Sequence, residues 1–394
     1  MVAGAARARG VERRPEYGVA FIDWLACACA GAAERAAVAA RAAGDDLPAT
    51  VAFAATAGHV LDYDDTFADG VAHVSAACAP AALAVAAELG LTLGDALDAY
   101  AEGFEAMAAL AETSHPELYE RGWHPTAVCG PIGAAVAASR LFRLTPEQRQ
   151  NALAVAALRA GGTRGAFGSD GKAIQVGLAA AAGVQAAMLA QAGASVDPRA
   201  IHGLLGFETV VGASWAVEGG EPPAILRNWI KLHPSCLGTH SPIDAAERLR
   251  SNGVGGGEEA VEIVVHPRAR QAAHLDAVED GLEAKFSIPY CVAHTLMRGA
   301  PGVRDFAAVD EAVSERARLV AVSVDDSLPE FGAIVRVEEE EVSRVQWPRG
   351  APDSPVTASE LRGKLIDLAG DRVEGLLDDL ERPASSAVDA AGLN

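Results

Sequence analysis

Aromatic residues, clustered cysteines and positive charge are all scarce in this sequence of 394 residues. Aromatic residues make up 5% of the chain, and 32 basic residues stand against 53 acidic ones, which gives a net charge of −21. The electrostatic field of so acidic a chain repels nucleic acid and anionic membrane surfaces, so neither is expected as a partner. A small anionic substrate would need cations gathered locally against this background.

Motifs for the common cofactors are also missing. The six cysteines form no C-x-x-C pair, which argues against an iron–sulfur cluster or a structural zinc site, and no disulfide framework is indicated for a chain of this length. No glycine-rich phosphate-binding motif lies between a strand and a helix, and no G-x-S-x-G elbow is found. We therefore expect buried, reduced thiols and no bound cofactor.

Alanine and glycine dominate the sequence, and half of its residues are hydrophobic, which suits a large core of closely spaced helices. Through the first half of the chain, helix signals recur with clear start and stop residues. Thr145, Pro146 and Gln148 together form an N-cap, a first-turn proline and a capping box. Gly193 follows another apolar helix as its C-terminal stop. The pattern predicts a mainly α protein with a large all-helical domain over residues 1–222.

The pattern changes after Pro222. Apolar residues then alternate as in strands in three segments, which are residues 261–265, 319–324 and 333–337. This section predicts a smaller α+β domain over residues 223–350, followed by further helices over residues 351–394. The acidic run 338–341 is interpreted as a solvated hairpin rather than a metal site.

The apolar stretch at residues 19–33 looks like the core of a signal peptide, but Asp23 interrupts it. We interpret this stretch as the first core helix. No run of 18 uncharged apolar residues is identified as a membrane span, so we expect a soluble, cytoplasmic protein.

Four loops stand out because each places polar residues directly before an alanine-rich helix. Helix N-termini carry unpaired N–H groups and partial positive charge, so they favour anions. A single histidine at such an end is more often structural, but several histidines with a lysine would make a pocket for carboxylates. The four loops are residues 58–66 with the following His73, residues 122–126, residues 168–172 and residues 233–240.

Three acidic residues, Asp62, Asp64 and Asp65, lie together in the first loop. Such residues commonly cap a helix or face water. Hard divalent cations also favour several carboxylates, but the loop lacks the glycine and the glutamate of an EF-hand. We therefore expect no metal site.

The ordered set of these loops resembles the MmgE/PrpD family. Residues 59–66 resemble the H-x-x-D-[FY]-D-D-T segment of that family, and the resemblance runs from about residue 20 to residue 380. Five further stretches follow in the order of the family, namely residues 122–126, 172–177, 234–245, 283–293 and 348–357.

The resemblance implies a large helical domain with a smaller α+β lid, C-terminal helices that return to the first domain, and a homodimer. The family contains 2-methylcitrate dehydratase, cis-aconitate decarboxylase and iminodisuccinate epimerase. The resemblance therefore also implies an enzyme that needs no cofactor and acts on a small anionic substrate.

The resemblance also assigns roles to individual residues. Catalytic roles fall on Asp62, His73, His124, Lys172 and His240. Substrate-binding roles fall on Thr66, His59, Gln175, Cys236 and Tyr290. Two positions depart from the family, because Gln175 stands where many relatives carry histidine and Cys236 stands where the decarboxylase has histidine. These departures bear on the substrate rather than on the type of reaction.

All three family reactions involve a carbanion next to a carboxylate, and its two negative charges need fixed donors and cations. We expect Lys172 to bind the carboxylates with help from His73 and His240, and Asp62 or His124 to move protons. The leading hypothesis is a lyase that dehydrates or decarboxylates a di- or tricarboxylate. The alternatives are an epimerase of an amino- or imino-dicarboxylate and a catalytically silent binding protein. His73, His124 and Lys172 argue against a silent protein.

Overall fold

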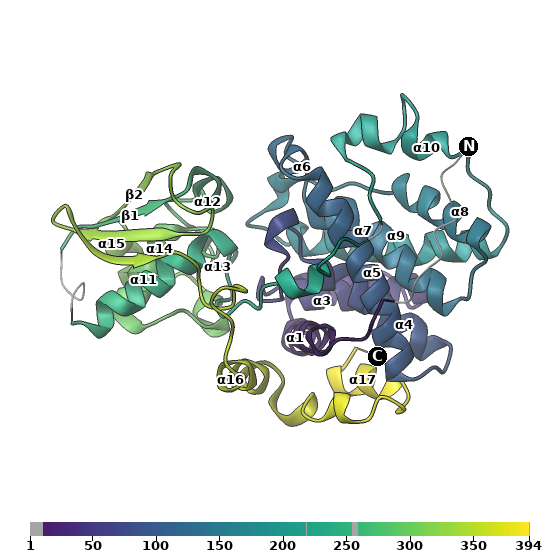
Figure 1. The fold of residues 1–394 in the computed structure, drawn as a ribbon. Coiled ribbons are helices and arrows are strands. Elements are labelled where there is room, and N and C mark those ends of the chain that lie inside the picture. The colour runs from purple at the N-terminus through teal and green to yellow at the C-terminus, as the bar shows by residue number, and fades with distance from the viewer. Residues whose placement is uncertain (1–10, 218, 254–258, 394) are drawn as a thin grey trace.

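The protein has two lobes of unequal size (Figure 1). The computed structural model describes residues 11–217, 219–253 and 259–393, and it is mainly helical with one small sheet, as the sequence predicts. Residues 1–10, which begin the predicted helical domain, lie outside the described residues.

The large lobe consists of helices from the first half of the chain, which share one hydrophobic core. The apolar stretch near the N-terminus forms the first helix, in which Asp23 is fully buried. Thr145 and Gln148 form the predicted capping box at the start of α8. The helices are α1 (Pro15–Gly31), α2 (Arg35–Ala42), α3 (Leu47–His59), α4 (Val74–Glu88), α5 (Leu93–Ser114), α6 (Glu117–Glu120), α7 (Pro125–Leu141), α8 (Pro146–Ala157), α9 (Gly171–Gln191) and α10 (Arg199–His202).

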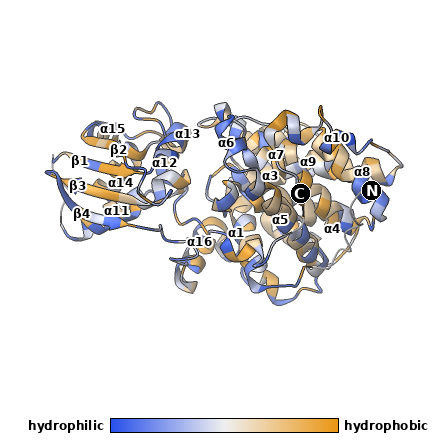
Figure 2. Ribbon diagram, turned by 45° about the horizontal axis from the view of Figure 1, so that its top comes forward, coloured by the Kyte–Doolittle hydropathy of each residue, from blue (hydrophilic) through white to orange (hydrophobic). Residues whose placement is uncertain are grey.

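Helix α9 runs through the large lobe and packs against α3, α7 and α8. Glycines make two of these contacts close, because a Cβ at Gly177 would lie 2.5 Å from the Ala52 carbonyl oxygen, and one at Gly183 would lie 2.4 Å from that of Pro131. Figure 2 shows hydrophobic residues concentrated among these helices. Among the described residues, α9 is also the one helix long and apolar enough to cross a membrane, but 61% of its apolar window is buried inside the structure, as in the core helix of a globular domain.

The small lobe contains a four-stranded sheet with the strand order β2-β1-β3-β4. Strand β1 pairs in parallel with β2 and antiparallel with β3, so that Ile263 lies opposite Val322 on one side and Val335 on the other. The elements of this lobe are α11 (His240–Ser251), β1 (Val261–Val265), α12 (Pro267–Ala272), α13 (Gly281–Ala284), α14 (Ile288–Arg298), α15 (Glu311–Ala317), β2 (Val320–Val324), β3 (Ala333–Val337) and β4 (Glu340–Val345).

The acidic run forms the exposed turn between β3 and β4 and the first two residues of β4, so it is part of a hairpin, as the sequence predicts. Glu338 and Glu339 both have positive φ angles, of 51° and 68°, which allow the chain to reverse tightly. Helices α11, α14 and α15 pack with the sheet into a second hydrophobic core, separate from that of the large lobe.

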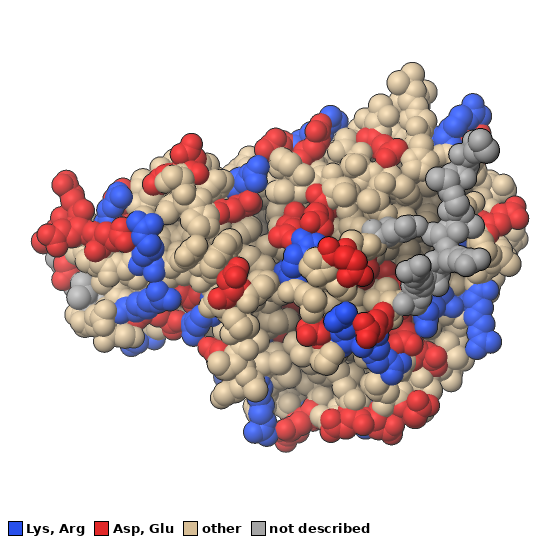
Figure 3. All heavy atoms as spheres, in the orientation of Figure 1, with Lys and Arg blue, Asp and Glu red and all other residues tan. Residues whose placement is uncertain are grey.

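The last helices return to the large lobe, where α16 (Ala358–Ala369) packs against α1 and α17 (Ser385–Ala391) packs against α4 (Figure 1). Figure 3 shows both signs of charge scattered over the visible face, with acidic side chains along the lower edge that the C-terminal segment forms. The C-terminal segment is therefore part of the wall of the large lobe, and α16 lies close to the boundary between the lobes.

Candidate active site

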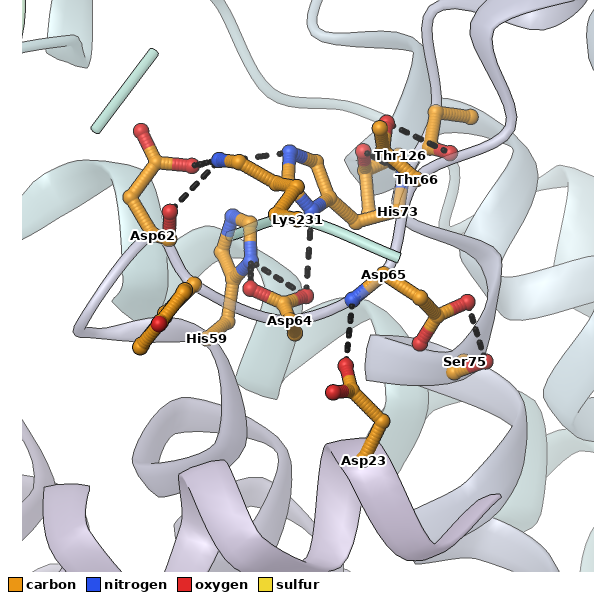
Figure 4. A network of polar contacts seen from close by, with 12 residues as sticks. Asp23, His59, Asp62, Asp64, Asp65, Thr66, His73, Ser75, Thr126 and Lys231 are labelled. Carbon is orange, nitrogen blue, oxygen red and sulfur yellow. Dashed lines mark hydrogen bonds and ion pairs between the residues drawn. The ribbon is translucent and has the colours of Figure 1, made fainter. Parts of the chain in front are cut away.

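Asp62 lies at the centre of a buried cluster of charges, in the loop that follows α3 (Figure 4). Its φ angle is 54°, in the left-handed region that aspartate tolerates better than most residues but that still signals a constrained position. The ammonium groups of Lys172 and Lys231 lie 2.9 Å and 2.8 Å from Asp62 Oδ1. One carboxylate oxygen thus faces two cations.

The two lysines reach Asp62 from different parts of the chain. Lys172 lies in the first turn of α9, the helix whose close packing fixes its position. Lys231 lies in the segment that links the lobes. This segment is held against the Asp62 loop by two backbone hydrogen bonds between Thr66 and Trp229, of 2.8 Å and 2.9 Å. Thr66 therefore helps to place Lys231 through its backbone.

Asp62 is ionised in this setting. Burial alone would raise the pKa of Asp62, but Lys172 and Lys231 hold that pKa well below its ordinary value. Asp62 Oδ2 has no hydrogen-bond partner among the described residues, although it is buried. A buried polar atom without a partner is rare and suggests a place where a ligand or water binds.

Asp64, two residues later, holds two imidazole rings. His59 Nδ1 lies 3.0 Å and His73 Nδ1 lies 3.1 Å from Asp64 Oδ2. Burial would raise the pKa of Asp64, but the two histidines keep it well below its ordinary value, so the carboxylate accepts hydrogen bonds from both rings. Each ring therefore carries a proton on Nδ1 and leaves Nε2 as the atom that can exchange protons.

The Nε2 atoms of these two rings have different surroundings. His73 Nε2 lies 3.6 Å from Asp62 Oδ1, whereas His59 Nε2 has no hydrogen-bond partner among the described residues. Burial lowers the pKa of His59 to about 4, so that ring is neutral at physiological pH. Figure 4 shows Asp62, His73 and His59 pointing toward one another from a single stretch of chain.

The third acid of the loop, Asp65, points away from the imidazoles. It accepts hydrogen bonds from Ser75 Oγ at 2.7 Å and from Asn228 Nδ2 at 2.6 Å. Burial and the neighbouring Asp23 raise the pKa of Asp65 well above its ordinary value, which favours its protonated form. Asp65 thus differs from Asp62 and Asp64 in its partners and in the direction of its pKa shift.

His124 is held in one tautomer by Gln175. The Thr163 backbone N–H donates to Gln175 Oε1 at 2.9 Å, and this contact fixes which end of the amide faces His124. Gln175 Nε2 then donates to His124 Nδ1 at 2.7 Å, so His124 carries its proton on Nε2. Burial lowers the pKa of His124 well below its ordinary value, and the ring is therefore a neutral hydrogen-bond donor.

Three helix N-termini meet at the cluster. His73 is the N-cap residue of α4, His124 is the N-cap residue of α7, and Lys172 lies in the first turn of α9. The Thr126 hydroxyl accepts a hydrogen bond of 3.0 Å from the His73 backbone N–H, which couples α7 to α4. The partial positive charge of these helix ends adds to that of the lysines.

The small lobe closes the site with Lys285. Its ammonium group is buried and donates to the Leu61 carbonyl oxygen at 2.6 Å, across the boundary between the lobes. Burial, together with Lys231 and Lys172 and against Asp62, lowers the pKa of Lys285 to about 8. Asp62, Lys172, Lys285 and His59 line a cavity of about 20 Å³, which is room for about one water molecule.

The structure brings some of the predicted site residues together and leaves others apart. Asp62, His59, His73 and Lys172 contact one another directly or through Asp64. The His124 ring stacks beside that of His59, with centroids 6.1 Å apart, and Gln175 follows as the partner of His124.

The remaining predicted residues lie at the edge of the cluster or beyond it. Cys236 is a buried thiol whose backbone N–H donates to the Lys285 carbonyl oxygen. His240 bonds the Ser235 carbonyl oxygen at 3.2 Å and, among the described residues, has no hydrogen bond to the Asp62 cluster. The Tyr290 hydroxyl accepts a hydrogen bond from the Asp310 backbone and so turns toward α15.

Three residues of the cluster were not among the predicted site residues. Lys231 and Lys285 are buried lysines in otherwise apolar segments, and this placement is the one signal that the sequence offered for them. Asp64 was noted as part of an acidic loop, but nothing in the sequence showed that two imidazoles share it.

Within the part of the chain that the structure describes, two groups of side chains have the composition of a metal site. The ligand atoms of His59, Asp64 and His73 lie within 4.8 Å of one another. Hydrogen bonds from the two imidazole Nδ1–H groups to Asp64 already account for that spacing. The second group is His233, Asp244 and Glu247. There the Arg349 guanidinium contacts both carboxylates and supplies the positive charge.

Models of one protein family match both halves of the chain. The profile described as the MmgE/PrpD N-terminal domain matches residues 46–218, and the profile described as the MmgE/PrpD C-terminal domain matches residues 233–380. Proteins named cis-aconitate decarboxylase from Aspergillus terreus and Homo sapiens are each 30% identical to the chain over the aligned residues. The one from Aspergillus terreus aligns over 214 residues, 48% of this chain and 42% of the relative. The one from Homo sapiens aligns over 212 residues, 49% of this chain and 42% of the relative.

The protein of that name from Mus musculus is 28% identical over 272 residues, which is 63% of this chain and 54% of the relative. The chain thus spans about half the length of the curated relatives that it matches, or somewhat less. The matched part of the chain includes every segment that contributes to the Asp62 cluster except the one around Lys231, which falls between the two profiles.

Proposed function

The chain belongs to the MmgE/PrpD family, and on that premise we propose that it is a cofactor-independent lyase acting on a small di- or tricarboxylate. The observation that carries the proposal is the concentration of three buried ammonium groups in a chain of net charge −21. Lys172 and Lys285 line the cavity beside Asp62, and Lys231 pairs with Asp62 itself. Burying cations is costly unless an anion balances them. Asp62 balances one of the three, which leaves a site suited to further carboxylates.

The proposed reaction proceeds through a carbanion next to a carboxylate. When a carbon–carbon or carbon–hydrogen bond breaks, its electron pair passes into the neighbouring carboxylate, which then carries two negative charges. Lys172, Lys231 and Lys285 stabilise these charges by direct hydrogen bonds in a site that excludes water. His124 adds a neutral N–H donor from Nε2.

Proton transfer is assigned to His73. Its Nδ1–H is held by Asp64, which orients the ring, so that Nε2 gives or takes the proton at carbon. Asp62 is a weaker candidate for this role, because two ammonium groups keep it ionised. In this scheme Asp62 holds the lysines in place until substrate carboxylates arrive.

Substrate entry requires the lobes to separate. The cavity has room for about one water molecule, far less than a tricarboxylate needs. The Lys285 hydrogen bond to Leu61 crosses the boundary between the lobes, so its breaking and remaking accompanies opening and closure. Closure then excludes water from the carbanion.

Incubation with a panel of small polycarboxylates in deuterated water, followed by NMR, tests the proposal. The panel includes cis-aconitate, 2-methylcitrate and an imino-dicarboxylate. Decarboxylation removes one carbon as carbon dioxide and adds one deuteron, dehydration forms a double bond with loss of water, and epimerisation exchanges a proton without net loss. Exchange alone would replace the lyase by an epimerase, and no reaction or exchange with any member would contradict the proposal.

A further inference from the structure

Lys364 is a buried ammonium group behind the candidate site, with three oxygen atoms around it. It lies on α16, near the C-terminal end of the chain, and is 4% exposed. Its Nζ lies 2.6 Å from Asp23 Oδ1 on α1, and it donates to the carbonyl oxygens of Tyr63 at 2.7 Å and of Lys231 at 2.9 Å. Two of its N–H donors thus go to carbonyl groups, and the Asp23 carboxylate supplies the opposite charge.

Both carbonyl groups belong to segments that form the site. Tyr63 directly follows Asp62, and Lys231 is itself one of the two cations on Asp62. The Tyr63 ring lies over the same ammonium, 4.2 Å from its Nζ, and the Tyr63 hydroxyl donates to the Leu232 carbonyl oxygen at 3.2 Å. One side chain from α16 thus joins the Asp62 loop to the Lys231 segment.

The positive charge of Lys364 is secured by Asp23. Burial alone would lower the pKa of Lys364, but the Asp23 carboxylate raises it above its ordinary value, so the group is an ammonium at neutral pH. Asp23 also accepts a hydrogen bond of 3.1 Å from the Asp65 backbone N–H, which ties α1 to the same loop. The buried aspartate of the first helix and the lysine of the C-terminal helix act on one loop from behind.

We propose that Lys364 is a positioning residue that fixes the Asp62 loop and the Lys231 segment relative to each other, so that the C-terminal helix is a part of the site. The proposal rests on the proposed function only in treating Asp62 and Lys231 as site residues. Without the ammonium, two buried carbonyl groups lose their donor, and the segments that carry them lose a shared anchor.

A simpler interpretation is that Lys364 and Asp23 form a buried ion pair that only stabilises the fold. Two variants distinguish this interpretation from the positioning role. One is the single variant Lys364→Met, and the other is a double variant that combines Asp23→Asn and Lys364→Met. The double variant has no unpaired buried charge, so its melting temperature should recover toward that of the wild type. The carbonyl groups of Tyr63 and Lys231 still lack a donor in it, so a positioning defect should persist.

Hydrogen–deuterium exchange of the full chain measures the positioning directly. The reporters are the backbone amides of Thr66 and Trp229, which bond each other's carbonyl groups across the two segments. We expect both amides to exchange at least about tenfold faster in the single and in the double variant, because local opening governs their exchange. The matched control is Glu102→Gln, which breaks another buried ion pair, that of Glu102 with Arg140 and Arg149, on α5.

Binding of propane-1,2,3-tricarboxylate, measured by calorimetry on the same variants, provides the second readout. We expect roughly tenfold weaker binding in both Lys364 variants and unchanged binding in Glu102→Gln. Wild-type exchange at Thr66 and Trp229 in the Lys364→Met variant, with a lowered melting temperature alone, would overturn the positioning role. If exchange rises as expected but the wild type does not bind the tricarboxylate, the positioning role stands and the proposed function fails.

Discussion

Two buried carboxylates in the large lobe each face two cations, yet they differ in what they leave unpaired. Glu102 on α5 is 8% exposed, and its two oxygens are divided between Arg140 and Arg149. Asp62 is 3% exposed, and both of its lysines contact the same oxygen, Oδ1. Asp62 Oδ2 has no hydrogen-bond partner among the described residues.

The backbone conformations of Glu102 and Asp62 differ as well. Glu102 lies in the middle of a regular helix, whereas Asp62 has a φ angle of 54° in a loop beside a cavity. A fully satisfied ion pair in regular structure has no capacity left for a ligand. A constrained residue with an unpaired oxygen and shared cations is typical of a site that exchanges its partners. Glu102 is therefore interpreted as structural and Asp62 as functional, and this contrast can be tested.

Replacing Lys172 should have the largest effect on turnover. Lys172→Ala removes one cation from the Asp62 oxygen, while Lys231 still pairs with that oxygen, so we expect an intact fold. The loss of charge stabilisation should lower kcat/KM by about 10²–10³, or about 3–4 kcal/mol. Kinetics on the substrate found in deuterated water and a thermal melt on the same preparation check this.

If Glu102 is structural and Asp62 is functional, Glu102→Gln should lower stability and leave turnover unchanged. That variant should keep its kcat/KM and lose about 1–3 kcal/mol in stability, because two guanidinium groups lose the charge of their partner. If both variants lost stability and activity in parallel, the distinction between the two carboxylates would disappear.

Replacing Asp64 should have an intermediate effect. In Asp64→Asn the carboxylate that orients the His73 ring is lost, and we expect kcat to fall by about 10- to 100-fold, the range found when the partner of a metal-bound histidine is replaced. Asp65→Asn is the matched control from the same loop, since Asp65 has a raised pKa and points toward Ser75 and Asn228 rather than toward an imidazole. Equal losses in the two variants would remove His73 from its assigned role.

A change of pH should have a smaller effect on anion binding than these substitutions have on turnover. Lys285 has a pKa of about 8 in the free protein, so it is an ammonium below that pH and loses its proton above it. Affinity for a tricarboxylate should therefore fall as the pH rises through about 8, by at most about tenfold per pH unit. Calorimetry at pH 7 to 9 measures the slope. The same slope in Lys285→Met would show that another group is responsible.

Chelation should have no effect. The spacing of His59, Asp64 and His73 is explained by hydrogen bonds, so we expect EDTA to leave turnover unchanged. Loss of activity with EDTA and its recovery on adding a divalent ion would replace the histidine mechanism by a metal-dependent one.

The mainly helical class and several site segments were predictable because their signals are local. The capping box at Thr145 marks a helix start that needs no distant partner. Polar residues directly before an alanine-rich helix likewise drew attention to His73, His124 and Lys172. Packing then brings these three helix starts together, and that step depends on contacts such as the one at Gly177, which sequence patterns do not encode.

The missed residues share a different property, which is dependence on distant partners. Lys231 binds Asp62 across 169 residues, Lys285 binds Leu61 across 224, and Lys364 binds Tyr63 across 301. A lone lysine in an apolar segment is usually exposed, so composition alone does not predict its burial. The direction of a side chain is equally hidden, and the Tyr290 hydroxyl turns toward Asp310 because the small-lobe core surrounds its ring.

The central claim, that the Asp62 cluster binds carboxylates, is tested most directly by calorimetric titration with propane-1,2,3-tricarboxylate, which cannot undergo the proposed elimination. We predict one binding site per chain in the wild type and in Glu102→Gln. In Lys172→Ala the affinity for the tricarboxylate should be weaker by at least about tenfold. Equal affinity in Lys172→Ala, or no binding to the wild type, would contradict the central claim.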